Sequence, residues 1–278
     1  MSTRDGDTGA ERFIAALLER HAAPLRRSEF LKAIRALSAR YVERRATLAD
    51  RSPLDSAGKR AAFAAYYAPL HYLTVGHILD ALGSRALDRV VDLGCGTGVA
   101  GAAWAVKCPS ATLLGVDRSG WAVEEAAWTY RTLGLSGRAT RGDLVRATES
   151  LAGPKPGPAY VRQPGPAYER QGRPAYLRAT GVILAWSSNE LEAPARSRLL
   201  STLVELGRSG ASILIVEPIS RRAAPWFDDW AAVITKAGGR QDDWRFDEPR
   251  PPSLSRIDIE VGFDRAELTA RSLAINLP

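Results

Sequence analysis

The chain has 278 residues, 45% hydrophobic and 25% charged, which is typical of a globular protein. No stretch approaches the ~18 consecutive apolar residues of a membrane span, and the acid-containing N-terminus is unlike a secretory signal. We therefore expect a cytoplasmic protein that contacts no membrane. Two cysteines exclude a disulfide scaffold and a four-cysteine metal centre, so no metal site is expected.

The net charge is +7, and the basic excess is concentrated in residues 1–60 and 131–180. Basic segments on an otherwise mildly acidic chain favour contact with a polyanion such as RNA. A high-GC genome, which favours arginine codons, explains the same excess equally well. Charge alone leaves both interpretations open.

The first 85 residues predict helices after a disordered start at residues 1–10. Apolar residues recur at helical spacing in three stretches. The first stretch begins at Ala10, and the second runs from Ser28 to about Arg45. The third runs from Ala57 to Leu82 with an interruption at Pro69. The sequence thus predicts a helical N-terminal region over residues 1–85.

From residue 86 onwards, short apolar runs alternate with helical patterns. Strands are predicted at 89–93, 111–116, 137–141, 182–186, 212–216, 257–261 and 272–275. One helix is predicted between the first two strands, ending at residue 107, and three more are predicted at 121–133, 193–206 and 226–237. This alternation is typical of an α/β fold with a mostly parallel sheet, and we assign residues 86–278 to one such domain.

Residues 153–178 interrupt that domain with three copies of the unit Pro-Ala-Tyr-x-Arg. Prolines at this density cannot continue a helix or a central strand, which predicts a loop insertion of polyproline character. The simpler interpretation is a neutral repeat expansion. The alternative is an arm whose tyrosines stack on RNA bases while its arginines bind phosphates.

A glycine-rich turn, Asp92-Leu-Gly94-Cys95-Gly96-Thr97-Gly98, follows the first strand of the domain. Glycines there permit a tight turn and let a ligand approach the backbone. The dinucleotide fingerprint has glycine or alanine where this chain has Val99. A nicotinamide dinucleotide is therefore disfavoured.

This pattern resembles motif I of class I methyltransferases, whose Rossmann-like sheet has seven strands and binds S-adenosylmethionine. The resemblance implies that the backbone from Gly94 to Gly98 lies against the amino-acid part of the cofactor and that Asp92 orients its ammonium group. By the same resemblance, Asp117 at the end of the second strand accepts hydrogen bonds from the ribose hydroxyls. Arg118, the next residue, is assigned to the same site.

Further on, the resemblance places Asp143 at the adenine amino group and the backbone N–H of Leu144 at the adenine ring. The ordinary alternative for Asp143 is a turn or a helix cap. Trp186, after the fourth strand, is assigned to the methionine part of the cofactor, with core packing as the alternative.

Acceptor chemistry is expected beyond the carboxyl end of the fourth strand. Asn189 and Glu190 are the candidate catalytic residues there, although Glu190 could instead cap a helix. The Asn/Asp-Pro-Pro-aromatic turn common in enzymes that methylate base amino groups is absent. Neither cysteine stands where methylation of a pyrimidine carbon needs a nucleophile.

A narrower resemblance covers most of the chain except the insertion. Four segments, 37–41, 64–72, 187–191 and 217–218, are similar to a methyltransferase-like family associated with the small ribosomal subunit. This implies ribosomal RNA or the small ribosomal subunit as partner. Members of that family often carry an iron–sulfur centre, but two cysteines cannot supply its four ligands, so none is expected here. A small-molecule methyltransferase and a non-catalytic assembly factor that binds the cofactor remain the alternatives.

Overall fold

The computed structural model describes residues 3–43, 54–83, 85–153, 177, 179–248 and 250–277. Nearly all of the predicted insertion at 153–178 lies outside these residues. The helices before the sheet are α1 (Thr3–His21), α2 (Arg27–Glu43), α3 (Ala57–Ala62), the π-helix η2 (Phe63–Tyr67) and α4 (Ala68–Leu82). The later helices are α5 (Val99–Val106), α6 (Gly120–Thr132), α7 (Leu144–Ala152), η4 (Ser188–Glu190), α9 (Ala193–Arg208), α10 (Phe227–Lys236) and α11 (Pro252–Val261). None of these helices combines the length and the apolar character that crossing a lipid bilayer requires.

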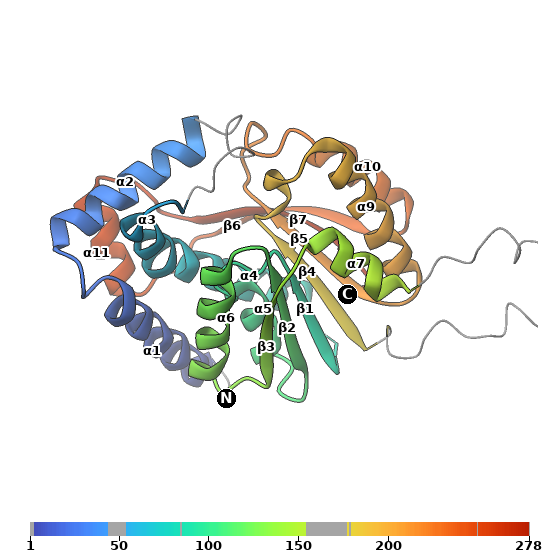
Figure 1. Ribbon diagram of the computed structural model, residues 1–278, viewed down its shortest axis with the longest axis horizontal. Coiled ribbons are helices and arrows are strands. Elements are labelled where there is room, and N and C mark those ends of the chain that lie inside the picture. The colour runs from blue at the N-terminus through green and yellow to red at the C-terminus, as the bar shows by residue number, and fades with distance from the viewer. Residues whose placement is uncertain are drawn as a thin grey trace, which may run out of the picture.

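Seven strands form one sheet through the middle of the molecule (Figure 1). They are β1 (Arg89–Leu93), β2 (Thr112–Asp117), β3 (Gly137–Arg141), β4 (Thr180–Ala185), β5 (Ser212–Glu217), β6 (Arg240–Phe246) and β7 (Leu268–Ile275). Their spatial order is β3-β2-β1-β4-β5-β7-β6. The first five strands pair in parallel, whereas β7 is antiparallel to both β5 and β6. This arrangement confirms the predicted seven-stranded, Rossmann-like class I methyltransferase fold.

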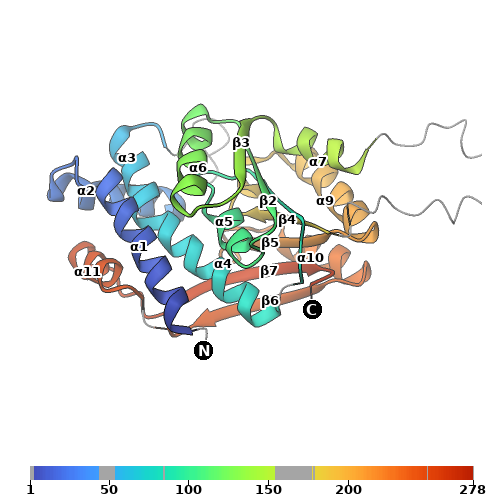
Figure 2. The ribbon, with the colours of Figure 1, turned by 90° about the horizontal axis from the view of Figure 1, so that it is seen from below.

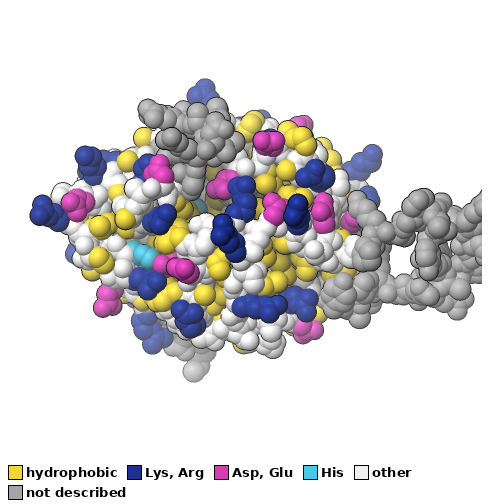
Figure 3. Space-filling model, viewed as in Figure 1, with side chains coloured by type: hydrophobic (Ala, Val, Ile, Leu, Met, Phe, Trp, Pro, Cys, Tyr) yellow, Lys and Arg dark blue, Asp and Glu magenta, His cyan; other side chains and the backbone are white. Residues whose placement is uncertain are grey.

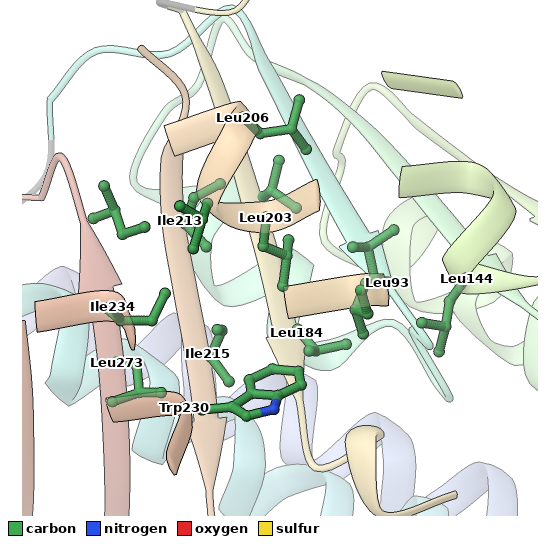
Figure 4. Close-up of a cluster of buried hydrophobic side chains, with 14 of the residues drawn as sticks. Leu93, Leu144, Leu184, Leu203, Leu206, Ile213, Ile215, Trp230, Ile234 and Leu273 are labelled. Carbon is green, nitrogen blue, oxygen red and sulfur yellow. The ribbon is translucent and has the colours of Figure 1, made fainter. Parts of the chain in front are cut away.

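Side chains alternate across the sheet, and each face buries its own core. On one face, Leu93, Leu184 and Ile215 pack beneath α7, α9 and α10 (Figure 4). On the other face, the strand residues Val90 and Ile183 pack against α4, α5 and α6. Strands buried on both faces explain the continuous apolar runs that the sequence shows at β4 and β5.

The N-terminal helices lie beside α11, which comes from the far end of the chain (Figures 1 and 2). A third core joins Phe30 and Ile34 of α2, Tyr66 of η2, and Ile257 of α11. Helix α4 also packs directly on the sheet. The division of the chain at residues 85 and 86 stays a prediction.

Three sequence expectations are wrong. Residues 257–261 are not a strand but the end of α11, because Leu254, Ile257 and Val261 have helical spacing and face one core. The first helix begins at Thr3, so residues 3–10 are helical. The interruption near Pro69 is a π-helical turn over Phe63–Tyr67 that precedes the proline.

The edge strand β6 went unpredicted because its sequence, RQDDWRF, is mostly polar. Its pairing with β7 supplies the partner that the sequence alone does not reveal.

Candidate functional site

The glycine turn between β1 and α5 has three residues in the left-handed region. Gly94, Gly96 and Gly98 have φ values of 66°, 52° and 79°. The backbone N–H groups of Gly94 and Cys95 both donate to the carbonyl of Val116 on β2, at 2.8 and 3.0 Å. A side chain is excluded at Gly94, since a Cβ atom there would lie 2.6 Å from Cβ of Ser187. The turn is thus a fixed, bare stretch of backbone.

Two carboxylates hold this turn from opposite ends. Asp92 is 1% exposed, and its Oδ2 accepts a hydrogen bond from the N–H of Gly101 at 2.8 Å. Asp117 accepts from the N–H of Gly96 at 2.9 Å and from the N–H of Ser119 at 2.8 Å. Each oxygen of Asp117 keeps a second lone pair with which it can accept a hydroxyl. The pKa of Asp92 is raised to about 7, mainly by burial and in part by nearby Asp117, against the lowering effect of the Gly101 hydrogen bond.

A cavity of about 910 Å³ opens over this turn. It is lined by Ser38, Phe63, Tyr67, Leu70, His71 and Thr74 from the N-terminal helices, and by residues 264–269 before and at the start of β7. The predicted site residues that line it are Asp92, Gly94, Cys95, Gly96, Thr97, Asp117, Arg118, Leu144, Trp186, Asn189 and Glu190. Eleven sequence candidates therefore share one cavity, and their individual roles stay predictions.

Two other candidates lie beside the cavity rather than in its wall. Gly98 packs against α6, where a Cβ atom would lie 2.6 Å from the ring of Tyr130. Asp143 is the N-cap of α7, and its Oδ1 accepts from the N–H of Arg146 at 2.9 Å. The helix-cap alternative for Asp143 is thus present in the structure, and its assignment to adenine stays a prediction.

Cys95 contributes to the cavity wall, but its thiol packs in the core beside Tyr130. Burial raises the pKa of this thiol well above its usual value. Cys95 is therefore a neutral, buried residue rather than a nucleophile.

Trp186 stands directly after β4 with a φ of 53°, which is unusual for a bulky residue. Its N–H donates to the carbonyl of Val216 at 2.9 Å. The indole lies face to face with His71, with ring centroids 3.7 Å apart and an angle of 9° between the planes. Burial, aided by Arg265, lowers the pKa of His71 to about 3, so this imidazole is neutral. The stacked pair forms a flat wall of the cavity.

The two catalytic candidates are both engaged by neighbouring side chains. Asn189 accepts from Nε1 of Trp226 at 3.0 Å and donates to buried Glu217 at 3.4 Å. Glu190 is about half exposed, and its Oε2 lies 3.5 Å from Nη2 of Arg118. Burial and nearby Asp117 raise the pKa of Glu190, which Arg118 opposes. Glu190 is thus the better placed of the two to exchange a proton.

Part of the cavity wall could not be predicted from the sequence. Phe63 lies within 3.8 Å of the position that a Cβ atom on Gly96 would occupy. Arg265 reaches the cavity from the segment after α11. No local pattern marks either residue, and treating 257–261 as a strand concealed the turn that brings Arg265 inward.

The wall suits an adenosyl cofactor. A bare backbone turn next to a carboxylate with free acceptor capacity matches a ribose-containing ligand. The hydroxyl of Thr97, 1% exposed, has no hydrogen-bond partner in the described part of the chain, so a bound ligand could supply one.

Residues 76–152 match the model of the family described as "Methyltransferase small domain". The chain is similar to trans-aconitate 2-methyltransferase of Pseudomonas aeruginosa, with 39% identity over 80 residues, which are 29% of each protein. It is also similar to ribosomal RNA large subunit methyltransferase G of Streptomyces coelicolor, with 46% identity over 65 residues, or 23% of this chain and 16% of the relative. The chain thus matches less than a third of either curated relative.

Among solved structures, the methyltransferase domain of bacterial CtHen1 superposes with a TM-score of 0.45 at 16% identity, over 75% of this chain and all of that one. The family match covers β1 to α7, the part of the sheet that carries the glycine turn and Asp117. The fold is that of class I methyltransferases, and enzymes of this fold and of the matched family use S-adenosylmethionine.

Proposed function

We propose that this chain is a methyltransferase that binds S-adenosylmethionine over the glycine turn. One observation supports this above all others: the carboxylate of Asp117 holds the bare turn at Gly96 and faces the same cavity. The family match over residues 76–152 supports the same conclusion. In this proposal Asp117 binds the ribose, Asp92 holds the ammonium group, and Trp186 flanks the methionine part.

Methyl transfer from a sulfonium is an in-line displacement, and the bound cofactor supplies the activated methyl group. The protein then needs to align the acceptor and exclude water. The His71–Trp186 stack and the aromatic residues of η2 provide a dry wall for this purpose. Glu190, with its raised pKa, is the candidate to take a proton from an acceptor that carries one.

The acceptor is, in our proposal, a small molecule. Helices η2 and α4 and the segment 264–269 line the cavity on sides that the glycine turn leaves open. The volume of this cavity, about 910 Å³, is in the range typical of small-molecule sites. On the face shown in Figure 3, acidic and basic side chains are interspersed rather than gathered into one basic patch. The name of the Pseudomonas relative states a small acceptor.

Ribosomal RNA, or a particle containing it, is the second candidate for the acceptor. It is supported by the net charge of +7 and by the name of the Streptomyces relative, which states ribosomal RNA. A protein that binds the cofactor without transferring its methyl group is the third.

Calorimetry tests the cofactor part of the proposal. S-Adenosylmethionine and S-adenosylhomocysteine should both bind the purified chain, whereas NAD should not. Saturable binding of NAD without binding of either sulfur nucleoside would refute the proposal.

The acceptor is tested separately with RNA. For a small-molecule enzyme, affinity for a ribosomal RNA fragment should be weak. Tight RNA binding that falls steeply with salt would favour the second candidate, and a methylated nucleotide lost from ribosomal RNA on gene deletion would establish it.

A further inference from the structure

Arg265 brings a positive charge into the cavity wall beside three aromatic rings. Its guanidinium carbon lies 4.6 Å from the ring centre of Phe263, 5.5 Å from that of Tyr66 and 5.6 Å from that of Tyr67. Rings at these distances attract a guanidinium through their faces. A guanidinium has five N–H donors, so Arg265, which also hydrogen-bonds the hydroxyl of Tyr67, retains donors for a ligand.

The backbone of Arg265 is also held in place. Its carbonyl accepts a hydrogen bond from Nη2 of Arg250. Arg250 in turn forms an ion pair with Asp258 of α11, which accepts a hydrogen bond from the hydroxyl of Tyr66. Arg250 and Asp258 are 10% and 4% exposed, so this chain of contacts is shielded from water. Arg265 is therefore positioned before any ligand arrives.

The other arginines around it have carboxylate partners. Arg250 pairs with Asp258, and Arg245 pairs with Glu267 at 3.1 Å. Among the ion pairs formed by the described residues, none includes Arg265. Of the other carboxylates in the cavity wall, those of Asp92, Asp117 and Glu190 belong to the side of the glycine turn. Those of Asp247 and Asp264 are exposed, and water screens charges in such positions.

The geometry points to Arg265 as the anchor for a carboxylate of the small acceptor. This inference rests on the proposed function, because it assumes that the glycine turn holds the cofactor and leaves the rest of the cavity to the acceptor. The guanidinium fork matches a carboxylate in shape and charge. Phe63, Tyr67 and His71 contribute flat rings to the same cavity wall, so the acceptor is a flat or aromatic acid.

Benzoate and benzamide provide a matched pair of probes, because they share size and shape and differ in charge. Their dissociation constants are measured by ligand-observed NMR on the full chain saturated with S-adenosylhomocysteine. Wild-type protein should bind benzoate about tenfold more tightly than benzamide, the preference expected of a hydrogen bond to a charged group. Arg265→Gln should abolish this preference, and Arg265→Lys should restore part of it.

Arg221→Gln is the control, since it removes the same charge from an arginine that is 82% exposed and outside the cavity wall. It should keep the benzoate preference. The circular dichroism spectrum of each variant should match that of the wild type. Equal binding of benzoate and benzamide to wild-type protein, or binding of neither, would overturn the inference.

Two further binding measurements test whether Arg265 instead binds the anionic group of a different ligand. If Arg265→Gln weakens S-adenosylhomocysteine about tenfold or more, Arg265 serves the carboxylate of the cofactor and the acceptor assignment fails. If uridine monophosphate binds in an Arg265-dependent way and benzoate does not, the anion is a nucleotide phosphate and the inference also fails. Failure of the proposed function gives a different result, namely wild-type protein that binds no S-adenosylhomocysteine at all.

Discussion

Replacing Gly94 with alanine should damage the cofactor turn in two separable ways. Gly94 has a φ of 66°, and holding alanine in that region costs about 1–2 kcal/mol. The new Cβ atom would also lie 2.6 Å from Cβ of Ser187 and 3.2 Å from Cδ2 of Leu144. Ser187 cannot simply move away, because its hydroxyl donates to the carbonyl of Leu93 at 3.1 Å. Overpacking of this kind costs a further ~1–3 kcal/mol.

Gly134 is the matched control, because it has the same φ of 66° but nothing within 4 Å of the point that a Cβ atom would occupy. Gly134→Ala should lose only the conformational part of the stability. Gly94→Ala should lose both parts, about 2–5 kcal/mol in total. The free energies of unfolding follow from urea titration monitored by the fluorescence of the seven tryptophans.

The same two variants separate stability from binding. Gly94→Ala should weaken S-adenosylhomocysteine at least about tenfold in calorimetry, because the turn itself is displaced. Gly134→Ala should leave that affinity unchanged. If both variants lost the same stability and bound the nucleoside equally well, the predicted clash between a Cβ atom at position 94 and Ser187 would contribute nothing. That result would refute the prediction.

Three further predictions concern single carboxylates. Asp117→Ala should weaken S-adenosylhomocysteine by about 1–3 kcal/mol, as expected when a hydroxyl loses a charged acceptor; unchanged affinity in calorimetry would remove the ribose assignment. Because burial raises the pKa of Asp92 to about 7 and the ammonium group of the ligand prefers the ionised form, affinity for the nucleoside should rise with pH up to about 7 and level off above it. Calorimetry at several pH values would contradict this if the wild type and Asp92→Asn gave the same profile. Burial raises the pKa of Glu125, but contacts with His21 and Arg20 outweigh burial and lower this pKa to about 2. The contribution of Glu125 to folding stability should therefore be constant above about pH 5 and fall as the pH drops from there to 2. Glu125→Gln should flatten that acid limb in urea titrations, and an unchanged limb would show that this contact between α1 and α6 contributes nothing.

The class of fold and half of the site could be predicted from local sequence. The strands at 89–93 and 137–141 have the predicted bounds, because short apolar or turn-bounded runs leave little choice of structure. The glycine turn could also be predicted, since the left-handed backbone conformations at positions 94, 96 and 98 favour glycine. The carboxylates Asp92 and Asp117 follow, because parallel strands end at the same edge of a sheet.

The acceptor side of the cavity could not be predicted in this way. Arg265 and Phe63 lie far from the glycine turn in the sequence, and neither belongs to a repeating pattern. The positive φ of Trp186 and its contact with His71 could not be predicted either, because His71 is more than 100 residues away in the sequence.

The sequence by itself determined where the five parallel strands, the bare turn and its carboxylates lie, because these features depend on conformational preferences within a few residues. Only the tertiary structure decided what closes the cavity. Helix α11 packs onto α2 and η2 and so joins two distant parts of the chain. The apolar area that this contact buries depends on both parts and cannot be predicted from either sequence segment alone. That packing places Arg265 among aromatic rings in the cavity wall. Nothing in the local sequence distinguishes this arginine from those on the surface.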